Sequence, residues 1–213
     1  MGVSEDHYFS ARPASADERR EITVELAGRS WALETAPGVF SPGHLDLGTT
    51  VLLREVPPPP ADAFLDLGCG WGPLALSAAL LEPRARVTAV DVNERALDLV
   101  RLNAERVARS AALAPIDALL PTDVPADRSF RTVWSNPPIR IGKEALHELL
   151  ATWMPRIVPG GEAWLVVQKN LGADSLARWI ADQGWGEVER VASSKGFRVL
   201  RLARGGEWGT TGA

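Results

Sequence analysis

Residues 64–74 read FLDLGCGWGPL. The first four are typical of a short buried strand, and glycines at alternate positions follow them directly. Pro73 then stands where proline is tolerated, in the first turn of a helix. Glycine adopts positive φ and lets a ligand lie against the backbone, while the start of a helix presents free N–H groups. A strand, a glycine loop and a helix in this order predict a ligand-binding turn more strongly than a simple tight connection.

The glycine spacing and two acidic residues indicate the kind of ligand. The pattern is G-x-G-x-G, whereas a dinucleotide site has G-x-G-x-x-G. A carboxylate at Asp66 is awkward for a pyrophosphate and suits a ligand with a cationic amine. Asp91 closes the next predicted strand, where an acid commonly accepts hydrogen bonds from ribose hydroxyls. In isolation Asp91 would indicate a helix cap, but together with the glycine loop it predicts ribose binding.

Outward from the glycine loop, strand and helix patterns alternate. Further strands are expected at residues 87–90, 116–120, 132–134, 163–167, 188–192 and 197–202. Helices are expected at residues 74–81, 94–109, 144–153 and 175–182, the last capped by Asp174. This alternation predicts an α/β fold with a doubly wound, mostly parallel sheet. Ligands bind such sheets beyond the carboxyl ends of the strands, so the chemistry is expected in the loops that follow the strands.

The N-terminal part predicts a small addition to this core. Residues 22–26 and 31–35 have the pattern of two short strands joined by a turn at Ala27-Gly28. Asp46 is a candidate cap for a helix that ends at Glu55, and the four prolines from residue 57 predict a stiff connector. The predicted division is a β-hairpin extension that packs on the core (1–40), the main domain (41–205) and a flexible tail (206–213).

A second loop motif follows the strand at residues 132–134 and reads Ser135-Asn136-Pro137-Pro138-Ile139. Two consecutive prolines make a rigid turn, which holds the Asn136 side chain and the neighbouring carbonyls in place. An amide oxygen and a backbone carbonyl together accept both hydrogens of a planar –NH2 group and orient its nitrogen lone pair. An isolated N-P-P would indicate only a strand-end turn. In this loop of this sheet it predicts a site that acts on an amine.

The composition limits the classes of protein to which this chain can belong. With 213 residues and 46% hydrophobic content, the chain is long enough for one domain with a sizeable core, with or without a small extension. Its net charge of −4 argues mildly against a general nucleic-acid binder but leaves room for a local basic patch. The single cysteine, Cys69, excludes an intrachain disulfide and a zinc cluster, so no metal is expected. Without a signal-peptide pattern or a bilayer-length apolar run, a cytoplasmic protein without membrane contact is expected.

These motifs together resemble a known family. The glycine loop, Asp91 and the N-P-P turn are similar to those of class I methyltransferases that use S-adenosylmethionine, in particular the branch that methylates amino groups. Residues 38–41, 46–49, 136–143 and 196–200 are similar to the small-domain methyltransferases related to RsmC, which methylate guanine N2 in the 16S RNA of the small ribosomal subunit. The resemblance covers nearly the whole chain. It implies a seven-stranded Rossmann-like methyltransferase sheet with an antiparallel last strand.

The resemblance also implies a role for individual residues, with S-adenosylmethionine as the cofactor. Cofactor contacts are then expected from Phe40, Ser41, Gly48, Asp66, Gly68, Cys69, Gly70, Asp91, Val92, Asp123 and Asn136. Asp66 and the glycines would hold the methionine part, Asp91 the ribose and Val92 the adenine. Asp123, with Asp117 as the alternative, would meet the adenine amine. The catalytic turn would be Asn136, Pro137, Pro138 and Ile139, with the Asn136 side chain and the Pro137 carbonyl gripping the target amine.

The same resemblance implies RNA as the partner, either small-subunit ribosomal RNA or the subunit itself. Five basic residues are candidates for RNA contact: Arg140, Lys143, Lys169, Lys195 and Arg198. Taken singly, each is equally consistent with a solvated surface charge. One position departs from the pattern of many amino methyltransferases, which have Tyr or Phe where this chain has Ile139. An isoleucine stacks less well on a base, which counts against DNA adenine or protein glutamine as the target.

Three other functions compete with this one. The main alternative is an S-adenosylmethionine-dependent N-methyltransferase for a small molecule or a protein side-chain amide, which the acidic balance favours slightly. A cofactor-binding module without catalysis is disfavoured because Asp66, Asp91 and Asn136 are all present. An NAD-dependent oxidoreductase is disfavoured by the glycine spacing and by the N-P-P turn.

Overall fold

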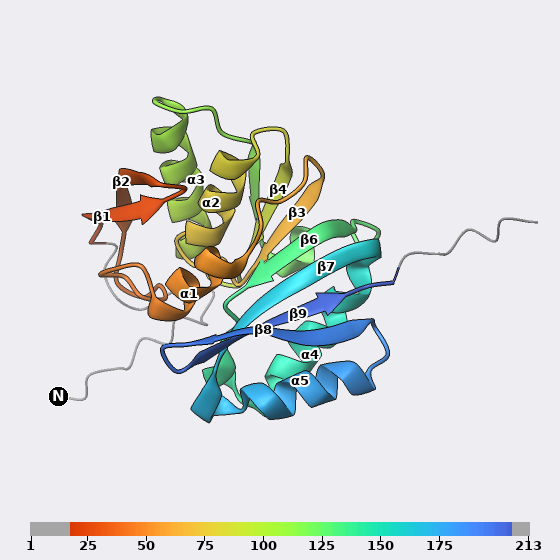
Figure 1. The fold of residues 1–213 in the computed structure, drawn as a ribbon. Coiled ribbons are helices and arrows are strands. Elements are labelled where there is room, and N and C mark those ends of the chain that lie inside the picture. Colours follow the sequence, from red (N-terminus) through yellow and green to blue (C-terminus); the bar gives the residue numbers. More distant parts are fainter. Residues whose placement is uncertain (1–17, 206–213) are drawn as a thin grey trace, which may run out of the picture.

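The computed structural model describes residues 18–205 (Figure 1). The strands are β1 (Arg20–Leu26), β2 (Arg29–Thr35), β3 (Ala63–Leu67), β4 (Arg86–Val90), β5 (Ile116–Leu119), β6 (Phe130–Ser135), β7 (Ile157–Gln168), β8 (Glu187–Ser194) and β9 (Phe197–Ala203). The helices are α1 (Leu47–Glu55), α2 (Pro73–Leu81), α3 (Glu94–Ala108), α4 (Lys143–Trp153) and α5 (Ala173–Asp182). Short 3-10 turns are η1 (Pro121–Asp123), η2 (Ile139–Ile141), η3 (Met154–Arg156) and η4 (Lys169–Leu171).

Seven strands form one sheet in the order β5-β4-β3-β6-β7-β9-β8. The strands from β5 to β7 pair in parallel, whereas β9 runs antiparallel to both of its neighbours. The predicted fold class, including the antiparallel last strand, is therefore confirmed. The chain leaves β3 toward β4 and β5 and later returns to the other side of β3 as β6. The strand order thus reverses beside β3, and this is where sheets of this type open a crevice for a ligand.

Helices cover both faces of the sheet, so its central strands are buried on both sides and are mostly apolar. Successive strand residues face opposite sides. Phe64 packs in a core with α1, α2 and α3, and its neighbour Leu65 packs in a second core with α4 and α5. Trp134 of β6 meets Phe64 edge to face, with ring centroids 4.9 Å apart. These two cores hold the strand ends rigidly, and the loops that carry the motifs start from them.

The predicted hairpin is formed by β1 and β2, with Ala27 and Gly28 at φ values of 49° and 74° in the turn. Positive φ at both central residues is what a two-residue turn with the twist of a hairpin requires. The inner face of the hairpin is apolar, and Trp31 and Leu33 share a core with Leu99 of α3. The extension therefore packs on the main sheet domain through α3.

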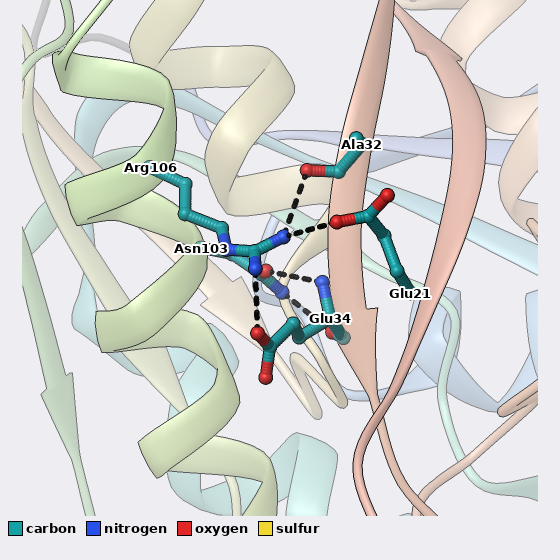
Figure 2. Close-up of polar contacts among 5 residues, drawn as sticks. All are labelled: Glu21, Ala32, Glu34, Asn103 and Arg106. Carbon is teal, nitrogen blue, oxygen red and sulfur yellow. Dashed lines mark hydrogen bonds and ion pairs between the residues drawn. The ribbon is translucent and has the colours of Figure 1, made fainter.

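A buried polar contact completes this docking (Figure 2). Asn103 of α3 accepts a hydrogen bond from the backbone N–H of Glu34 (2.7 Å) and donates one to its carbonyl (2.9 Å). The same Asn103 amide donates to the carbonyl of Trp71 in the glycine loop (3.2 Å). Arg106 lies beside it and forms ion pairs with Glu21 and Glu34. The hairpin, α3 and the glycine loop are thus joined through one side chain.

The prediction that Asp174 caps α5 is wrong. The helix begins at Ala173 after Gly172, whose φ is 96°, and no side chain accepts a hydrogen bond at its start. Asp174 instead pairs with Arg198 of β9, with 2.8 Å between Oδ1 and a guanidinium nitrogen. The carboxylate of Asp174 therefore forms a tertiary ion pair and does not cap the helix.

Two further findings concern residues 18–205 only. None of their helices has the length and the hydropathy that crossing a bilayer requires. No group of three or more His, Cys, Asp or Glu side chains among them is arranged to hold a metal ion. The predicted tail (206–213) and residues 1–17 of the predicted extension lie outside the described residues, so the proposed boundaries at residues 40 and 205 stay predictions.

Candidate active site

The glycine loop wraps over the ends of two neighbouring strands. The N–H groups of Gly68 and Cys69 both donate to the carbonyl of Val90, the last residue of β4 (2.8 and 3.0 Å). Gly68 and Gly70 have φ values of 75° and 53°, in the region that side chains disfavour. Gly72, at φ 100°, precedes α2, and a Cβ there would lie 3.0 Å from Val100 of α3. The alternating glycines are therefore needed both for backbone shape and for the close packing of α2 against α3.

Asp66 lies directly beneath this loop and is fully buried. Its Oδ2 accepts the N–H of Ala75 in the first turn of α2 (2.9 Å), while Oδ1 has no hydrogen-bond partner among the described residues. Burial raises the pKa of Asp66 to about 8, partly opposed by the Ala75 hydrogen bond and increased by the nearby Asp91 carboxylate. Asp66 does not line the cavity described below. Its visible contact ties the start of α2 to the end of β3.

Asp91 stands at the end of β4 and faces the loop. One of its oxygens accepts the N–H of Gly70 (2.9 Å) and the other accepts the N–H of Asn93 (2.9 Å). Burial raises the pKa of Asp91 above its usual value, although the backbone hydrogen bonds from Asn93, Gly70 and Val92 counteract this. A carboxylate has about four lone-pair sites, so the oxygens of Asp91 still have room for a ligand hydroxyl beside these backbone hydrogen bonds.

A cavity of about 450 Å³ opens at the carboxyl ends of the parallel strands, beside the reversal of strand order. This volume lies within the range of ~300–1,000 Å³ typical of small-molecule sites. The predicted residues that line it are Phe40, Ser41, Gly68, Gly70, Asp91, Val92, Asn136, Pro137, Pro138 and Ile139. These come from four separated segments of the chain. The structure thus brings the two sequence motifs, glycine loop and N-P-P turn, to one cavity.

Four predicted cofactor contacts do not line this cavity. Asp66 and Cys69 are buried behind the loop. Gly48 lies just behind the wall, where an added Cβ would be 2.9 Å from Asp46 and from Phe197. Asp123 is exposed in η1, two positions after Pro121, which does line the cavity.

The alternative acid for the adenine amine, Asp117, lies in a different place. It pairs with Arg128, and both residues line a separate hollow with Ala63, the first residue of β3. Asp117 is therefore at the amino ends of the strands, opposite the cavity. Only Asp123 stays compatible with the proposed role, since it follows the carboxyl end of β5.

The N-P-P turn is fastened to its neighbours at both ends. The hydroxyl of Ser135 donates to the carbonyl of Leu67 (2.6 Å), which ties the end of β6 to the glycine loop. Nδ2 of Asn136 donates to Oδ2 of Asp46 (2.8 Å) and to Oγ1 of Thr49 (3.1 Å). The carbonyl of Pro137 accepts the N–H of Ile139 (2.8 Å), which leaves this oxygen one lone pair for a substrate. The side-chain oxygen of Asn136 and the Pro137 carbonyl are thus two acceptors that the turn offers.

The basic residues divide into two groups. Lys143, Lys169 and Lys195 are exposed, and no carboxylate among the described residues lies within ion-pair distance of them. The backbone N–H of Lys169 donates to the carbonyl of Gly196 (2.8 Å), which holds η4 beside the β8–β9 turn at the Phe197 side of the cavity. Arg198 differs, because its side chain is buried and paired with Asp174. We therefore leave Arg198 out of the candidate RNA surface.

Several lining residues of the cavity were not assigned to the site from the sequence, and two of them lie beside Gly48. Asp46, predicted only as a helix cap, caps α1 and also holds Asn136. Phe197, at the start of β9, lines the cavity and would lie 2.9 Å from a side chain at Gly48. It provides an aromatic ring in a site whose turn has Ile139 instead of Tyr or Phe. Its only signal in the sequence was its place in the segment 196–200 that resembles the RsmC group.

The cavity suits S-adenosylmethionine. Glycines without a Cβ form one wall, where Gly68 and Gly70 have only Pro138 and Phe40 as nearest neighbours at 3.8 and 3.9 Å from an added Cβ. Asp91 lines the cavity at the end of the next strand, where an acid commonly binds a ribose, and Val92, Pro121 and Leu149 add apolar surface to the lining. The glycine wall, the Asp91 carboxylate and the apolar surface together fit a nucleoside ligand that has no pyrophosphate.

Comparisons with known proteins support this assignment. The family model "Methyltransferase small domain" matches residues 30–201. The chain is 29% identical over 200 residues to the uncharacterized protein YbxB of Bacillus subtilis, covering 93% of this chain and 98% of that one. It is 31% identical over 210 residues to ribosomal RNA small subunit methyltransferase C of Pseudomonas entomophila, covering 95% of this chain and 60% of the relative.

Among solved structures, the fold is similar to the T. thermophilus 16S rRNA N2 G1207 methyltransferase (RsmC), determined with AdoMet and guanosine. The TM-score is 0.74 at 22% identity, and the match covers 90% of this chain and 52% of that one. The chain thus spans between half and two thirds of the length of these ribosomal RNA methyltransferases. The family match, the sheet order and the cavity lead to one conclusion: the chain belongs to the methyltransferase small domain family, within the class I methyltransferases that use S-adenosylmethionine as cofactor.

Proposed function

We propose that this protein transfers a methyl group from S-adenosylmethionine to guanine N2 of 16S ribosomal RNA. The observation that carries the proposal is the position of the N-P-P turn. Its Asn136 and Pro137 line the same cavity as Gly68 and Asp91, so a nucleoside cofactor and a target amine would meet there. Two curated relatives at 31% and 30% identity are ribosomal RNA small subunit methyltransferases C, which supports RNA as the substrate class.

The reaction requires little of the protein beyond alignment of the target amine with the methyl group. S-adenosylmethionine supplies a methyl group that is already activated on a sulfonium sulfur. The nitrogen of an exocyclic guanine amine is a weak nucleophile because its lone pair is delocalised into the ring. Asn136 and the Pro137 carbonyl would accept its two hydrogens, favour a pyramidal nitrogen and aim its lone pair at the methyl carbon. This is catalysis by positioning, and the proton then leaves the product nitrogen to water.

The target base must leave its stack to enter such a cavity, as for other enzymes that modify bases. The ring of Phe197, which lines the cavity, would pack on it, and the walls formed by Pro138 and Ile139 would exclude water around the amine. Lys143, Lys169 and Lys195 would bind phosphates around the mouth, and this binding should weaken as salt rises. The side chain of Arg140, the remaining candidate, lies outside the described part of the structure. A ribosomal RNA substrate would place the enzyme in the cytoplasm.

A second candidate function is methylation of a small molecule or of a protein side-chain amide. The net charge of −4 favours it, because strong RNA binders usually carry a basic excess. The cofactor site and the role of Asn136 would be the same for this substrate. Only the mouth would differ, since no phosphates would need to be bound there.

The test is methyl transfer from radiolabelled S-adenosylmethionine to small ribosomal subunits that lack their native methylations, with naked 16S RNA in parallel. We expect label in N2-methylguanosine after nuclease digestion, and only a small residual amount with Asn136→Ala. If the purified protein binds S-adenosylmethionine by calorimetry but labels neither RNA substrate, the RNA proposal is refuted. Label that appears instead in an RNA-free cell extract would support the second candidate.

A further inference from the structure

The amide of Asn136 is held from one side by the start of α1. Both hydrogens of its Nδ2 have an acceptor, Oδ2 of Asp46 at 2.8 Å and Oγ1 of Thr49 at 3.1 Å. The same Asp46 oxygen accepts the backbone N–H of Thr49 (3.0 Å), so Asp46 caps α1 and holds Asn136 at once. Among the described residues none donates a hydrogen bond to Oδ1 of Asn136. This oxygen is therefore the polar atom of the side chain that is available to a substrate.

A carboxylate dictates which way an amide faces. It accepts hydrogen bonds and cannot donate them, so Asp46 is compatible only with the NH2 side of Asn136. If the amide rotated by half a turn, two acceptor oxygens would face each other at hydrogen-bond distance, in a partly buried site. The orientation that the structure shows is thus chemically determined by the residue at position 46. An asparagine or a serine at position 46 would cap α1 as well but would not impose this orientation.

The space around this contact is tight. A Cβ at Gly48 would lie 2.9 Å from Oδ2 of Asp46 and 3.3 Å from Nδ2 of Asn136, and also 2.9 Å from the Phe197 ring. Gly48 has no positive φ that would require glycine, so its lack of a side chain is explained by this packing. Thr49, the other acceptor, is 4% exposed. The Asp46–Asn136 pair therefore has little freedom to rearrange.

We propose that Asp46 is a positioning residue that locks the Asn136 amide with Oδ1 toward the substrate, and so selects an amino group over a carbonyl as methyl acceptor. This rests on the proposed function, since it assigns Asn136 to the target amine. A target that offers hydrogens finds an acceptor in this orientation, whereas a target oxygen finds repulsion. The competing explanation is that Asp46 serves only as the cap of α1.

The decisive variant is Asp46→Asn. It retains a good helix cap, and its own amide can turn to donate to Oδ1 of Asn136, which allows the wrong orientation. Loss of one charge-assisted hydrogen bond predicts a fall in the single-turnover rate of about ten- to a hundredfold. The melting temperature and the affinity for S-adenosylmethionine should change little. The matched control is Asp62→Asn, because Asp62 also accepts a backbone N–H, that of Ala63 (2.7 Å), but lies at the far end of β3; its rate should equal that of the wild type.

A second measurement does not depend on activity. The side-chain NH2 resonances of Asn136 should exchange slowly with solvent in the wild-type protein, and they should shift and exchange faster in Asp46→Asn. In addition, the double variant Asp46→Asn with Asn136→Ala should have the same residual rate as Asn136→Ala alone. A residue that acts only through Asn136 has no separate effect once Asn136 is replaced. A wild type without transfer to RNA, but with the expected Asn136 resonances and their shift, would refute the RNA substrate and leave the positioning role supported.

Unchanged Asn136 resonances in Asp46→Asn would overturn the proposal, whatever the rate does. A lower rate with unchanged resonances would identify Asp46 as a helix cap only. A further loss of rate in the double variant would show that Asp46 acts on the reaction independently of Asn136, and this too would contradict the positioning role.

Discussion

Replacement of Asp66 by asparagine should change how the stability of the protein depends on pH. Asp66 is fully buried under the glycine loop, and burial raises its pKa to about 8. In the unfolded chain an aspartate has a pKa of about 3.9. The folded state therefore holds the proton more tightly than the unfolded state. Its contribution to stability is fully present below about pH 4 and is lost progressively as the pH rises to about 8.

The size of the effect follows from the two pKa values. Over each pH unit between them, the free energy of unfolding should fall by ~1.4 kcal/mol because of this one group. From about pH 5 to about pH 8, the loss amounts to roughly 4 kcal/mol, a large share of the ~5–15 kcal/mol that stabilises a typical domain. Asparagine keeps the oxygen that accepts the Ala75 N–H and has no proton to lose. The variant should lack this slope, although an unpartnered amide at the position of Oδ1 adds a constant cost of ~1–3 kcal/mol.

The assay is urea unfolding of the wild type and of Asp66→Asn without cofactor, at intervals over this pH range. All other titrating groups are common to both proteins, so the difference between the two curves isolates Asp66 and its coupling to Asp91. We expect Asp66→Asn to be the less stable protein at low pH. The difference in the free energy of unfolding between it and the wild type should decrease as the pH rises. The carbon-13 resonance of the Asp66 carboxyl group should titrate near the upper end of the range. Parallel stability curves would show that Asp66 is ionised in the folded protein at an ordinary pKa, and the reasoning from burial would be refuted.

Three other changes have clear expected outcomes. Asn103→Ala should reduce the free energy of unfolding by roughly 2–4 kcal/mol in urea titration, because it leaves buried backbone groups of Glu34 and Trp71 without partners; a loss below about 1 kcal/mol would contradict this account of the docking. Phe197→Leu should weaken use of the RNA substrate by about five- to a hundredfold in kcat/KM while cofactor affinity is retained, since base stacking is worth ~1–3 kcal/mol; equal kcat/KM would remove Phe197 from base binding. Gly48→Ala should lower the transfer rate, because its methyl group would overlap Asp46 and Asn136, whereas Gly43→Ala, with no atom within 4 Å of the added Cβ, should transfer at the wild-type rate.

Local motifs made most of the fold predictable. The alternating glycines after Leu67 require positive φ, and the consecutive prolines at Pro137 make a rigid turn, so both leave clear marks in the residue types. The same holds for the hairpin turn at Ala27-Gly28. Such features are visible in a sequence because the conformation of a few adjacent residues decides them.

The wrong predictions concern residues that can interact either with neighbours in the sequence or with a distant segment of the chain. Asp174 has the right type and place for a cap, but the guanidinium of Arg198 on β9 takes it. Arg198 is then neutralised and buried, so it no longer belongs to a surface for phosphates. The sequence named Asp117 and Asp123 as alternatives. Only the register of β5 with β4 puts Asp117 at the amino edge of the sheet.

By itself, then, the sequence determined the order of strands and helices along the chain, and it predicted a glycine loop for a nucleoside cofactor and an N-P-P turn for an amine. The tertiary structure alone decided that Asp46 faces Asn136, at a sequence separation of 90 residues, and that Phe197 joins them. It also decided that Asp66 is buried beneath the glycine loop and does not line the cavity. The physical reason is the range of the interactions. Backbone conformation is encoded in neighbouring residues, whereas burial, the orientation of an amide and the partner of a charge depend on which segments the packed cores bring together.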